Sequence, residues 1–526
     1  MEKDNVNAVI ENKEALSFKI DRSQRMITLP PFENKQTIDI RYPLIAPYAF
    51  AHIFWDKIRN ELMYEVEEPI LNDVEKELLE LVQLGLEEMI NISFVRANKA
   101  NMLIDYLEKN VKSILIELGT RVSKKSYEKI MYFVYRDSVG LNEIETLMND
   151  YYIEDIECNG MGFPIYIVHR KYQNLRTNIQ FNNDAKLGDF VEKLAQKAGR
   201  YVSYARPLLD GTLPDGSRVN ATYTKDITTR GPTFTIRKFT KEPWTPIDLI
   251  KFGSATAEMY AYLWLAIEYK FNIMSIGETA SGKTTFLNAV LSFIPPEARI
   301  CSIEDTRELN LQHDNWLPSV TRAGFGVQGD STGEISLFDL LRESFRQNPD
   351  YVVVGETRGA EASVLFQGMA SGHASYTTFH ADSVEGLVKR LETPPINLSA
   401  SLVEALDIVC VATHVKREKK NFRRLTEIDE IIEITPGIGA VKKNVAFIWE
   451  PQRDIFKMNS SSVVLNKIIE RSGLSKEEIQ RELIIRTKIL KELVKQNMND
   501  FTKFTELINK YYKAPDVVMK ELNIIY

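Results

Sequence analysis

The spacing of apolar and polar residues changes along the chain, and each change marks a different kind of predicted structure. Residues 1–40 are polar and irregular, and part of this segment is expected to be mobile. After Pro69, the stretches NDVEKELLELVQLGLEEMI and NMLIDYLEKNVKSILIEL repeat apolar residues three and four positions apart, which predicts successive amphipathic helices. Residues 1–150 are therefore predicted to form a helical N-terminal subdomain.

Near residue 151 the pattern changes to short β-type runs. PIYIVHR, VNATYT and TFTIRKF are separated by NG, PDG and GP turn signals, and one helical stretch, FVEKLAQKAGRYV, interrupts them. Residues 151–238 are predicted to be an α+β module. The following KFTKEPWTPIDLI carries two prolines before a helical pattern begins, so residues 239–245 are the predicted linker.

From residue 246 onward, predicted strands and helices alternate. The runs FNIMSI, ARICSIE, DYVVVGE and YTTFH are short and continuously apolar, as strands are when both faces of a parallel sheet are buried. After residue 440 a hairpin-like piece, NVAFIWEPQRDIFKM, precedes charged amphipathic helices. Residues 246–526 are therefore predicted to be one α/β domain with C-terminal helices.

Composition narrows the class of protein. A chain of 526 residues is too long for one core, and its 66 basic and 73 acidic residues leave a net charge of −7, which argues against a surface dedicated to nucleic acid. The three cysteines show no C-x-x-C spacing, so no zinc module or disulfide framework is expected. No secretory signal and no run of about 18 apolar residues is seen, and a cytoplasmic location is expected.

A phosphate-binding loop is the strongest chemical signal. The pattern G-x-x-x-x-G-K-[ST] follows a predicted strand and precedes a predicted helix, which is the context that confirms it. Backbone N–H groups of such a loop surround phosphates; Lys283 would reach the β- and γ-phosphates of ATP, and Thr284 would hold Mg²⁺. The candidate nucleotide-binding residues are Gly277, Glu278, Thr279, Ala280, Ser281, Gly282, Lys283, Thr284 and Thr285.

Two further predicted strands end in acidic residues, and a third ends in a histidine. Glu356 closes DYVVVGE, where it would meet the Mg²⁺ shell or the attacking water. Glu304 and Asp305 end ARICSIED; one of them is expected to face the crevice as a base for water, while helix capping explains Asp305 equally well. His380 ends YTTFH and would contact a γ-phosphate or report its presence.

Taken in order, GETASGKTT, CSIEDTRE, NPDYVVVGETRG and SGHASYTTFHAD resemble the Walker A loop, Asp box, Walker B strand and His box of the type II and type IV secretion ATPase superfamily. LPDGSRVNATY and PTFTIRKF are similar to the domain that precedes the motor in that superfamily. YPLIAPYAF and YEVEEPILNDVE resemble its archaeal branch, which assembles archaella and type IV pili.

The resemblance implies a fold and a set of site residues. The fold is an α/β, RecA-like P-loop motor with C-terminal helices, preceded by a helical and PAS-like α+β N-terminal domain. Arginines of the PAS-like module are implied to reach the phosphates of ATP, and the matching positions are Arg206, Arg218 and Arg237. Each of these arginines is equally well explained as a solvated or salt-bridged surface residue.

The implied function is a hexameric ATPase that drives assembly of an archaeal filament, archaellum or pilus. Its implied partners are copies of itself and a polytopic platform protein at the inner face of the cell membrane, with no nucleic acid. A DNA or protein translocase of the type IV secretion kind is the alternative. A scaffold without turnover is disfavoured, because Lys283, Thr284, Glu304 and Glu356 are all present. The basic run at residues 415–425 would suit the platform or anionic lipid, but a solvated turn between strands is the preferred interpretation.

Overall fold

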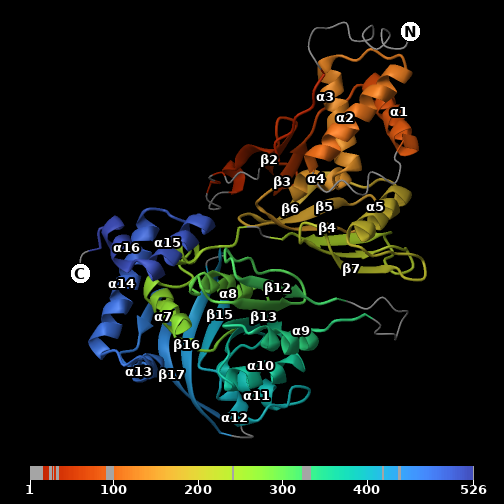
Figure 1. Ribbon diagram of the computed structural model, residues 1–526. Helices are drawn as coiled ribbons and strands as arrows, with labels where there is room; N and C mark the ends of the chain where they lie inside the picture. The colour runs from red at the N-terminus through yellow and green to blue at the C-terminus, as the bar shows by residue number, and fades with distance from the viewer. Residues whose placement is uncertain are drawn as a thin grey trace. The chain divides into compact units, whose positions relative to one another are not determined.

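The three-dimensional structure is a computed structural model, and it describes residues 16–22, 27, 29–30, 35–89, 100–239, 242–322, 333–417, 420–435 and 440–524 (Figure 1). The chain divides into two compact units, Met1–Phe239 and Thr240–Tyr526. Within the described residues each unit is built on one nine-stranded sheet. The division falls inside the predicted linker, of which residues 240 and 241 lie outside the described residues.

The sheet of the first unit has the strand order β1-β2-β3-β6-β5-β4-β9-β8-β7. Neighbouring strands are antiparallel except β3 and β6, which are parallel. The strands are β1 (Asp39–Ile45), β2 (Ala49–Asp56), β3 (Glu61–Glu67), β4 (Ile153–Cys158), β5 (Pro164–His169), β6 (Gln173–Gln180), β7 (Leu208–Thr212), β8 (Arg218–Thr222) and β9 (Thr233–Arg237).

The helices of the first unit pack on this sheet. They are α1 (Asp73–Met89), α2 (Ala100–Glu117), α3 (Lys124–Ser138), the short α4 (Glu145–Met148) and α5 (Asp184–Lys197), with 3-10 turns at Lys35–Thr37 and Asn142–Ile144. Ser123 caps α3 and Asn183 caps α5 through their side-chain oxygens. The buried Asp150 accepts hydrogen bonds from the hydroxyls of Tyr42 and Tyr64, each at 2.6 Å, which ties β1 and β3 to the start of the β4 region.

The prediction of a helical subdomain over residues 1–150 is wrong for residues 39–67, which form β1, β2 and β3. Strand β2 alternates buried and partly exposed positions over its first residues, with Ala49, Ala51 and Ile53 buried on one face. Because β3 pairs with β6, one sheet runs from this N-terminal segment into the predicted α+β module. Helices α1 and α2 agree with the two predicted amphipathic stretches, and α3 lies outside them.

The sheet of the second unit has the strand order β12-β11-β13-β14-β10-β15-β16-β17-β18. Pairing is parallel from β12 to β15 and antiparallel from β15 to β18, so the predicted parallel sheet is present and the predicted hairpin after residue 440 is β17 with β18. The strands are β10 (Ile273–Gly277), β11 (Ile300–Glu304), β12 (Trp316–Val320), β13 (Tyr351–Thr357), β14 (Ala374–Phe379), β15 (Ile408–Arg417), β16 (Lys420–Thr435), β17 (Ala440–Glu450) and β18 (Ile455–Met458).

Helices cover both faces of this sheet (Figure 1). Successive strand residues point to opposite faces, so Ile273 and Val353 join one core and Met274 and Val352 join the other. The helices are α6 (Pro246–Lys251), α7 (Ala257–Glu268), α8 (Lys283–Leu291), α9 (Leu337–Ser344), α10 (Glu361–Ala370), α11 (Val384–Glu392), α12 (Ala400–Val403), α13 (Val463–Ser472), α14 (Lys476–Lys495), α15 (Phe501–Lys513) and α16 (Pro515–Glu521), with a 3-10 turn at Phe345–Gln347. The predicted α/β fold class is confirmed.

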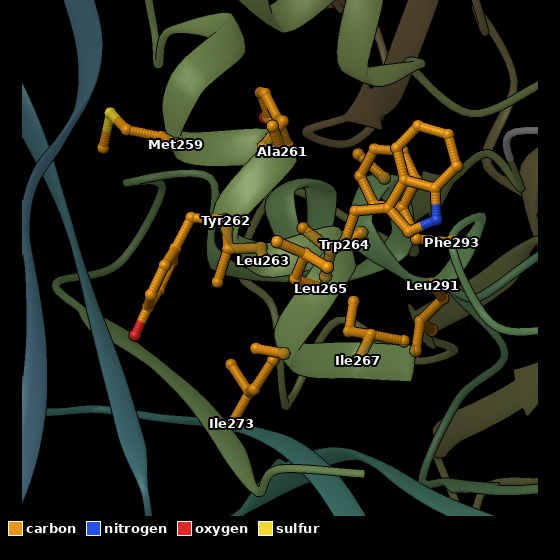
Figure 2. Packing of buried hydrophobic residues seen from close by; sticks show 14 of the residues in the cluster. Met259, Ala261, Tyr262, Leu263, Trp264, Leu265, Ile267, Ile273, Leu291 and Phe293 are labelled. Carbon is orange, nitrogen blue, oxygen red and sulfur yellow. The ribbon is translucent and has the colours of Figure 1, made fainter. Parts of the chain in front are cut away.

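The larger of these two cores surrounds α7. Trp264 of this helix is fully buried and stacks on Phe293 with a centroid distance of 5.1 Å (Figure 2). The guanidinium of Arg486, on α14, lies 4.8 Å from the Trp264 ring and pairs with Glu268. The C-terminal helices are therefore part of the α/β domain, as predicted. Among the described residues no helix is both long and apolar enough to cross a membrane.

Candidate functional site

The residues predicted to form the site lie at the ends of four adjacent parallel strands. Because β10, β11, β13 and β14 run parallel, their carboxyl ends meet at one edge of the sheet, where α/β proteins bind their ligands. The phosphate-binding loop follows β10, Glu304 ends β11, Glu356 lies near the end of β13, and His380 follows β14. The structure thus brings together the four sequence blocks found separately.

The loop has the conformation that its glycines permit. A Cβ atom at Gly277 would overlap the carbonyl oxygen of Ala412 on β15, so only glycine fits there. Ala280 has φ 61°, and Gly282, with φ 93°, begins α8 from the left-handed region. The Oγ of Ser281 is buried, and no described residue forms a hydrogen bond with it. Unpaired N–H groups at the start of α8 and this unsatisfied hydroxyl fit a phosphate ligand.

Lys283 is held inside the loop by its carbonyl groups. Its Nζ donates to the carbonyl oxygens of Gly277 at 2.9 Å and Glu278 at 2.8 Å, and it lies 3.4 Å from Nδ1 of His380. Burial lowers the pKa of Lys283, and the nearby Glu356 carboxylate opposes this shift. The ammonium therefore lies where it can exchange loop carbonyls for phosphate oxygens.

His380 bridges Lys283 and Glu356. Its Nε2 lies 2.8 Å from Oε1 of Glu356. Because an ammonium only donates, Nδ1 of His380 is the acceptor in the contact with Lys283. Burial and the positive charge of Lys283 lower the pKa of His380, so the ring is neutral at pH 7.

An irregularity in strand β13 sets the direction of the Glu356 side chain. The register of β13 on β14 shifts between Val354 and Thr357, which takes Gly355 and Glu356 out of the regular ladder and turns the carboxylate toward His380. The other oxygen, Oε2, accepts from the guanidinium of Arg358. Glu356 is thereby fixed between an imidazole and a guanidinium.

Glu304 is a buried carboxylate that ends β11. Its side chain lies against Gly355 and is 2% exposed. Oε1 accepts from the backbone N–H groups of Glu308 and Leu309, each at 2.9 Å, whereas Oε2 is buried and has no hydrogen-bond partner among the residues that the structure describes. Burial raises the pKa of Glu304 to about 7, and the two backbone hydrogen bonds oppose this shift.

The structure distinguishes between the two predicted roles of Asp305, a base for water and a helix cap. Asp305 is exposed, and the segment after it leads into β12 without a helix, so the capping role is not supported and Glu304 is the acid that faces inward. Thr284, the candidate Mg²⁺ ligand of the loop, is half-buried at the start of α8. Across the described ranges no group of three or more His, Cys, Asp and Glu residues could hold a metal by itself.

The three candidate arginines belong to the first unit. Arg218 and Arg237 are directly opposite each other on β8 and β9, so their side chains share one face of the sheet. Arg218 NH2 lies 3.1 Å from Asp210 Oδ2, and Arg237 Nε lies 3.3 Å from Asp155 Oδ1.

Arg206 is exposed on a separate loop, where it lies over the ring of Tyr201 at 5.4 Å. Arg206 is therefore not part of the cross-strand pair of Arg218 and Arg237. The approach of any of the three to phosphate stays a prediction.

Two residues near the site were missed in the sequence. Arg358 is two residues beyond Glu356 on the same extended segment, so alternation along the strand is a usable signal for it. Arg423 contacts the phosphate-binding loop through the carbonyl oxygen of Ala280. No local pattern marks Arg423, because its position depends on the pairing of β16 with β15.

A known protein family and several known proteins match much of this chain. The profile of a family described as "Type II/IV secretion system protein" matches residues 138–501. An uncharacterized protein of Methanocaldococcus jannaschii is 38% identical over 397 residues, which are 75% of this chain and 71% of the relative. The type IV secretion system protein PtlH of Bordetella pertussis is 29% identical over 279 residues, covering 46% and 80% of the two chains.

Two solved structures are also similar to the chain. The Legionella pneumophila ATPase DotB shares 16% identity with a TM-score of 0.38, covering 74% of this chain and 95% of its own. The pilus retraction motor PilT with bound ADP shares 16% identity with a TM-score of 0.38, covering 65% and 90%.

Proposed function

Because the chain belongs to the type II/IV secretion system protein family, we propose that it hydrolyses ATP to drive assembly of an archaeal type IV pilus-like filament, archaellum or pilus. The observation that carries the ATPase activity is the meeting of Lys283, His380 and Glu356 at the phosphate-binding loop. A structural turn would not need a buried lysine and two neighbouring carboxylates at the same sheet edge.

Binding of ATP uses the loop and the first turn of α8. Backbone N–H groups hold the phosphates, and Lys283 turns from the carbonyl oxygens of Gly277 and Glu278 to the β- and γ-phosphates. Bound Mg²⁺, held by Thr284 and with Glu356 in its shell, would neutralise charge on the phosphates.

Hydrolysis needs a base for the attacking water. Glu304 has a free Oε2 for this proton, and its pKa of about 7 suits a base at neutral pH. Glu356 orients the water and the cation, and His380, in contact with both Glu356 and Lys283, responds to the γ-phosphate.

The assembly follows from the family resemblance. The protein acts as a homohexamer in the cytoplasm, at the inner face of the cell membrane, where it moves a polytopic platform protein of the filament machinery. Arg218 and Arg237, with Arg206, supply positive charge to the phosphates when the two units close on ATP. The relative from Methanocaldococcus jannaschii, an archaeon, supports the archaeal branch.

A type IV secretion-like translocase of DNA or protein is the second candidate. Its support is the match to the Bordetella pertussis protein, whose name places it in a type IV secretion system. The net charge of −7 favours the filament motor over a DNA translocase.

Steady-state ATP hydrolysis tests the activity. Glu356→Gln is expected to lower kcat by at least about 100-fold while a fluorescent ATP analogue still binds, because the carboxylate acts in the reaction and not in holding the nucleotide. Glu433→Gln is the matched control, since Glu433 is an exposed residue of β16 in a surface pair with Lys442 at 3.6 Å. Full turnover by Glu356→Gln would refute the assignment.

The cargo needs its own measurement. Deletion of the gene in the native host, with electron microscopy of the cells, is expected to remove surface filaments, and the wild-type gene but not Glu356→Gln is expected to restore them. Stimulation of ATP hydrolysis by single-stranded DNA, with filaments intact in the deletion strain, would favour the translocase instead.

A further inference from the structure

One arginine reaches the phosphate-binding loop from outside every sequence block of the site. Arg423 lies on β16, which pairs antiparallel with β15, and β15 lies beside the loop strand β10. Its Nε donates to the carbonyl oxygen of Ala280 at 3.1 Å. Its Cδ lies 3.3 Å from the point that a Cβ atom of Gly282 would occupy. The side chain therefore lies along the loop, beside the three residues that precede Lys283.

The guanidinium of Arg423 is largely uncommitted. It has five N–H donors, and the contact with Ala280 uses one of them. In the part of the chain that the structure describes, Arg423 has no carboxylate partner. Its side chain is exposed, so the remaining donors are open to a ligand from solvent.

The next residue of the same strand is also an arginine, but its role is structural. Arg424 is 7% exposed and binds Asp454 with two hydrogen bonds of 3.0 Å, from Nε and from NH2. Its NH1 donates to the carbonyl oxygens of Phe252 and Arg423. Alternation along β16 thus places one arginine in a neutralised, buried pair and the other, without a counter-charge, against the loop.

We propose that Arg423 binds the phosphates of the nucleotide and completes a cationic pair with Lys283 around the loop. The guanidinium keeps unused donors beside the loop, and phosphate oxygens accept its parallel donors well. Unlike the arginines of the first unit, Arg423 belongs to the same unit as the loop, so it acts on nucleotide without closure of the two units. This inference rests on the proposed ATP site.

Equilibrium titration with fluorescent analogues of ATP and ADP tests the inference on the full-length protein. Arg423→Ala is expected to weaken binding of both nucleotides by about 10- to 100-fold, the effect of losing charge-assisted hydrogen bonds. Arg423→Lys is expected to recover part of the affinity, because it keeps the charge but not the planar donors. The salt dependence of binding is expected to become shallower in Arg423→Ala.

Lys416→Ala is the matched control. Lys416 is an exposed cation of the same β15–β16 hairpin, opposite Asn421, and its removal is expected to change affinity less than about twofold. The melting temperature without nucleotide is expected to be the same in the wild type and Arg423→Ala. Wild-type affinity in Arg423→Ala, or a matching loss of nucleotide-free stability, would overturn the inference. Absence of ATP binding by the wild type would instead refute the proposed function.

Discussion

At the scale of single residues, Glu304 combines a raised pKa with an unsatisfied oxygen. Its folded-state pKa of about 7 lies above the ordinary value of 4.5. Between these values the folded protein binds more protons than the unfolded chain, so this group's contribution to stability is present below pH 4.5 and is lost as the pH rises through 7. Above pH 7 the buried charge costs up to about 3 kcal/mol.

Glu304→Gln is therefore expected to raise the free energy of unfolding by about 1–3 kcal/mol at pH 8 and to change it little at pH 5. Glutamine keeps an oxygen for the N–H groups of Glu308 and Leu309 and removes only the charge. Urea unfolding of the nucleotide-free and Mg²⁺-free protein at the two pH values measures the difference. An equal effect at both pH values would show that the charge is not the cause.

The sequence alone predicted the positions of some site residues and missed others. Glu304, Glu356 and His380 end buried parallel strands, and parallel strands carry their ends to one edge, so short-range pattern was enough to predict their convergence. Arg423 gave no such signal, because it lies about 140 residues from Ala280 and a strand pairing brings them together. Because its neighbours in the sequence are basic, the preferred interpretation of residues 415–425 was a solvated surface. The buried side chain of Arg424 contradicts that interpretation.

At the scale of elements, the loop strand β10 is fitted tightly against β15. Gly277→Ala is expected to lower the free energy of unfolding by about 1–3 kcal/mol or more and to abolish nucleotide binding, because the added methyl would overlap the backbone of Ala412. Gly372→Ala is the control: its φ of 90° is equally unfavourable for alanine, but nothing lies within 4 Å of the added atom. Thermal unfolding and ATP-analogue binding of both variants separate backbone strain from the clash. Equal losses in the two variants would refute the tight fit.

Elements predicted from long, regular patterns were found, and those without such patterns were not. The two amphipathic stretches are α1 and α2, and the continuous apolar runs are β10, β11, β13 and β14. Strands β1 to β3 were missed, since their alternation is short and their place in the sheet is set by β6, more than 100 residues later. Pairing across such a distance carries no signal in one sequence.

At the scale of the whole molecule, each unit brings one part of the proposed reaction. The second unit holds the phosphate-binding loop with Glu304, Glu356 and Arg423, and the first unit carries Arg218 and Arg237 side by side on β8 and β9. Both of these arginines already have an aspartate partner, so in the proposed closure phosphate would have to compete with Asp210 and Asp155. Because of this competition, the contact of the two arginines with phosphate would depend on bound nucleotide. A motor requires a contact between its domains that depends on nucleotide in this way.

A closure driven by ATP is accordingly expected to depend on these arginines. Small-angle scattering should show a smaller radius of gyration with a non-hydrolysable ATP analogue, and Arg218→Ala is expected to lose this change and about 1000-fold in kcat while still binding the analogue. Arg59→Ala is the matched control, because Arg59 forms a comparable exposed pair with Asp56 at 3.5 Å in the same unit. A nucleotide shifts a conformational equilibrium only by its difference in affinity for the two states. Identical scattering profiles with and without the analogue would therefore mean that ATP does not distinguish an open arrangement from a closed one, and that Arg218 does not couple hydrolysis to motion.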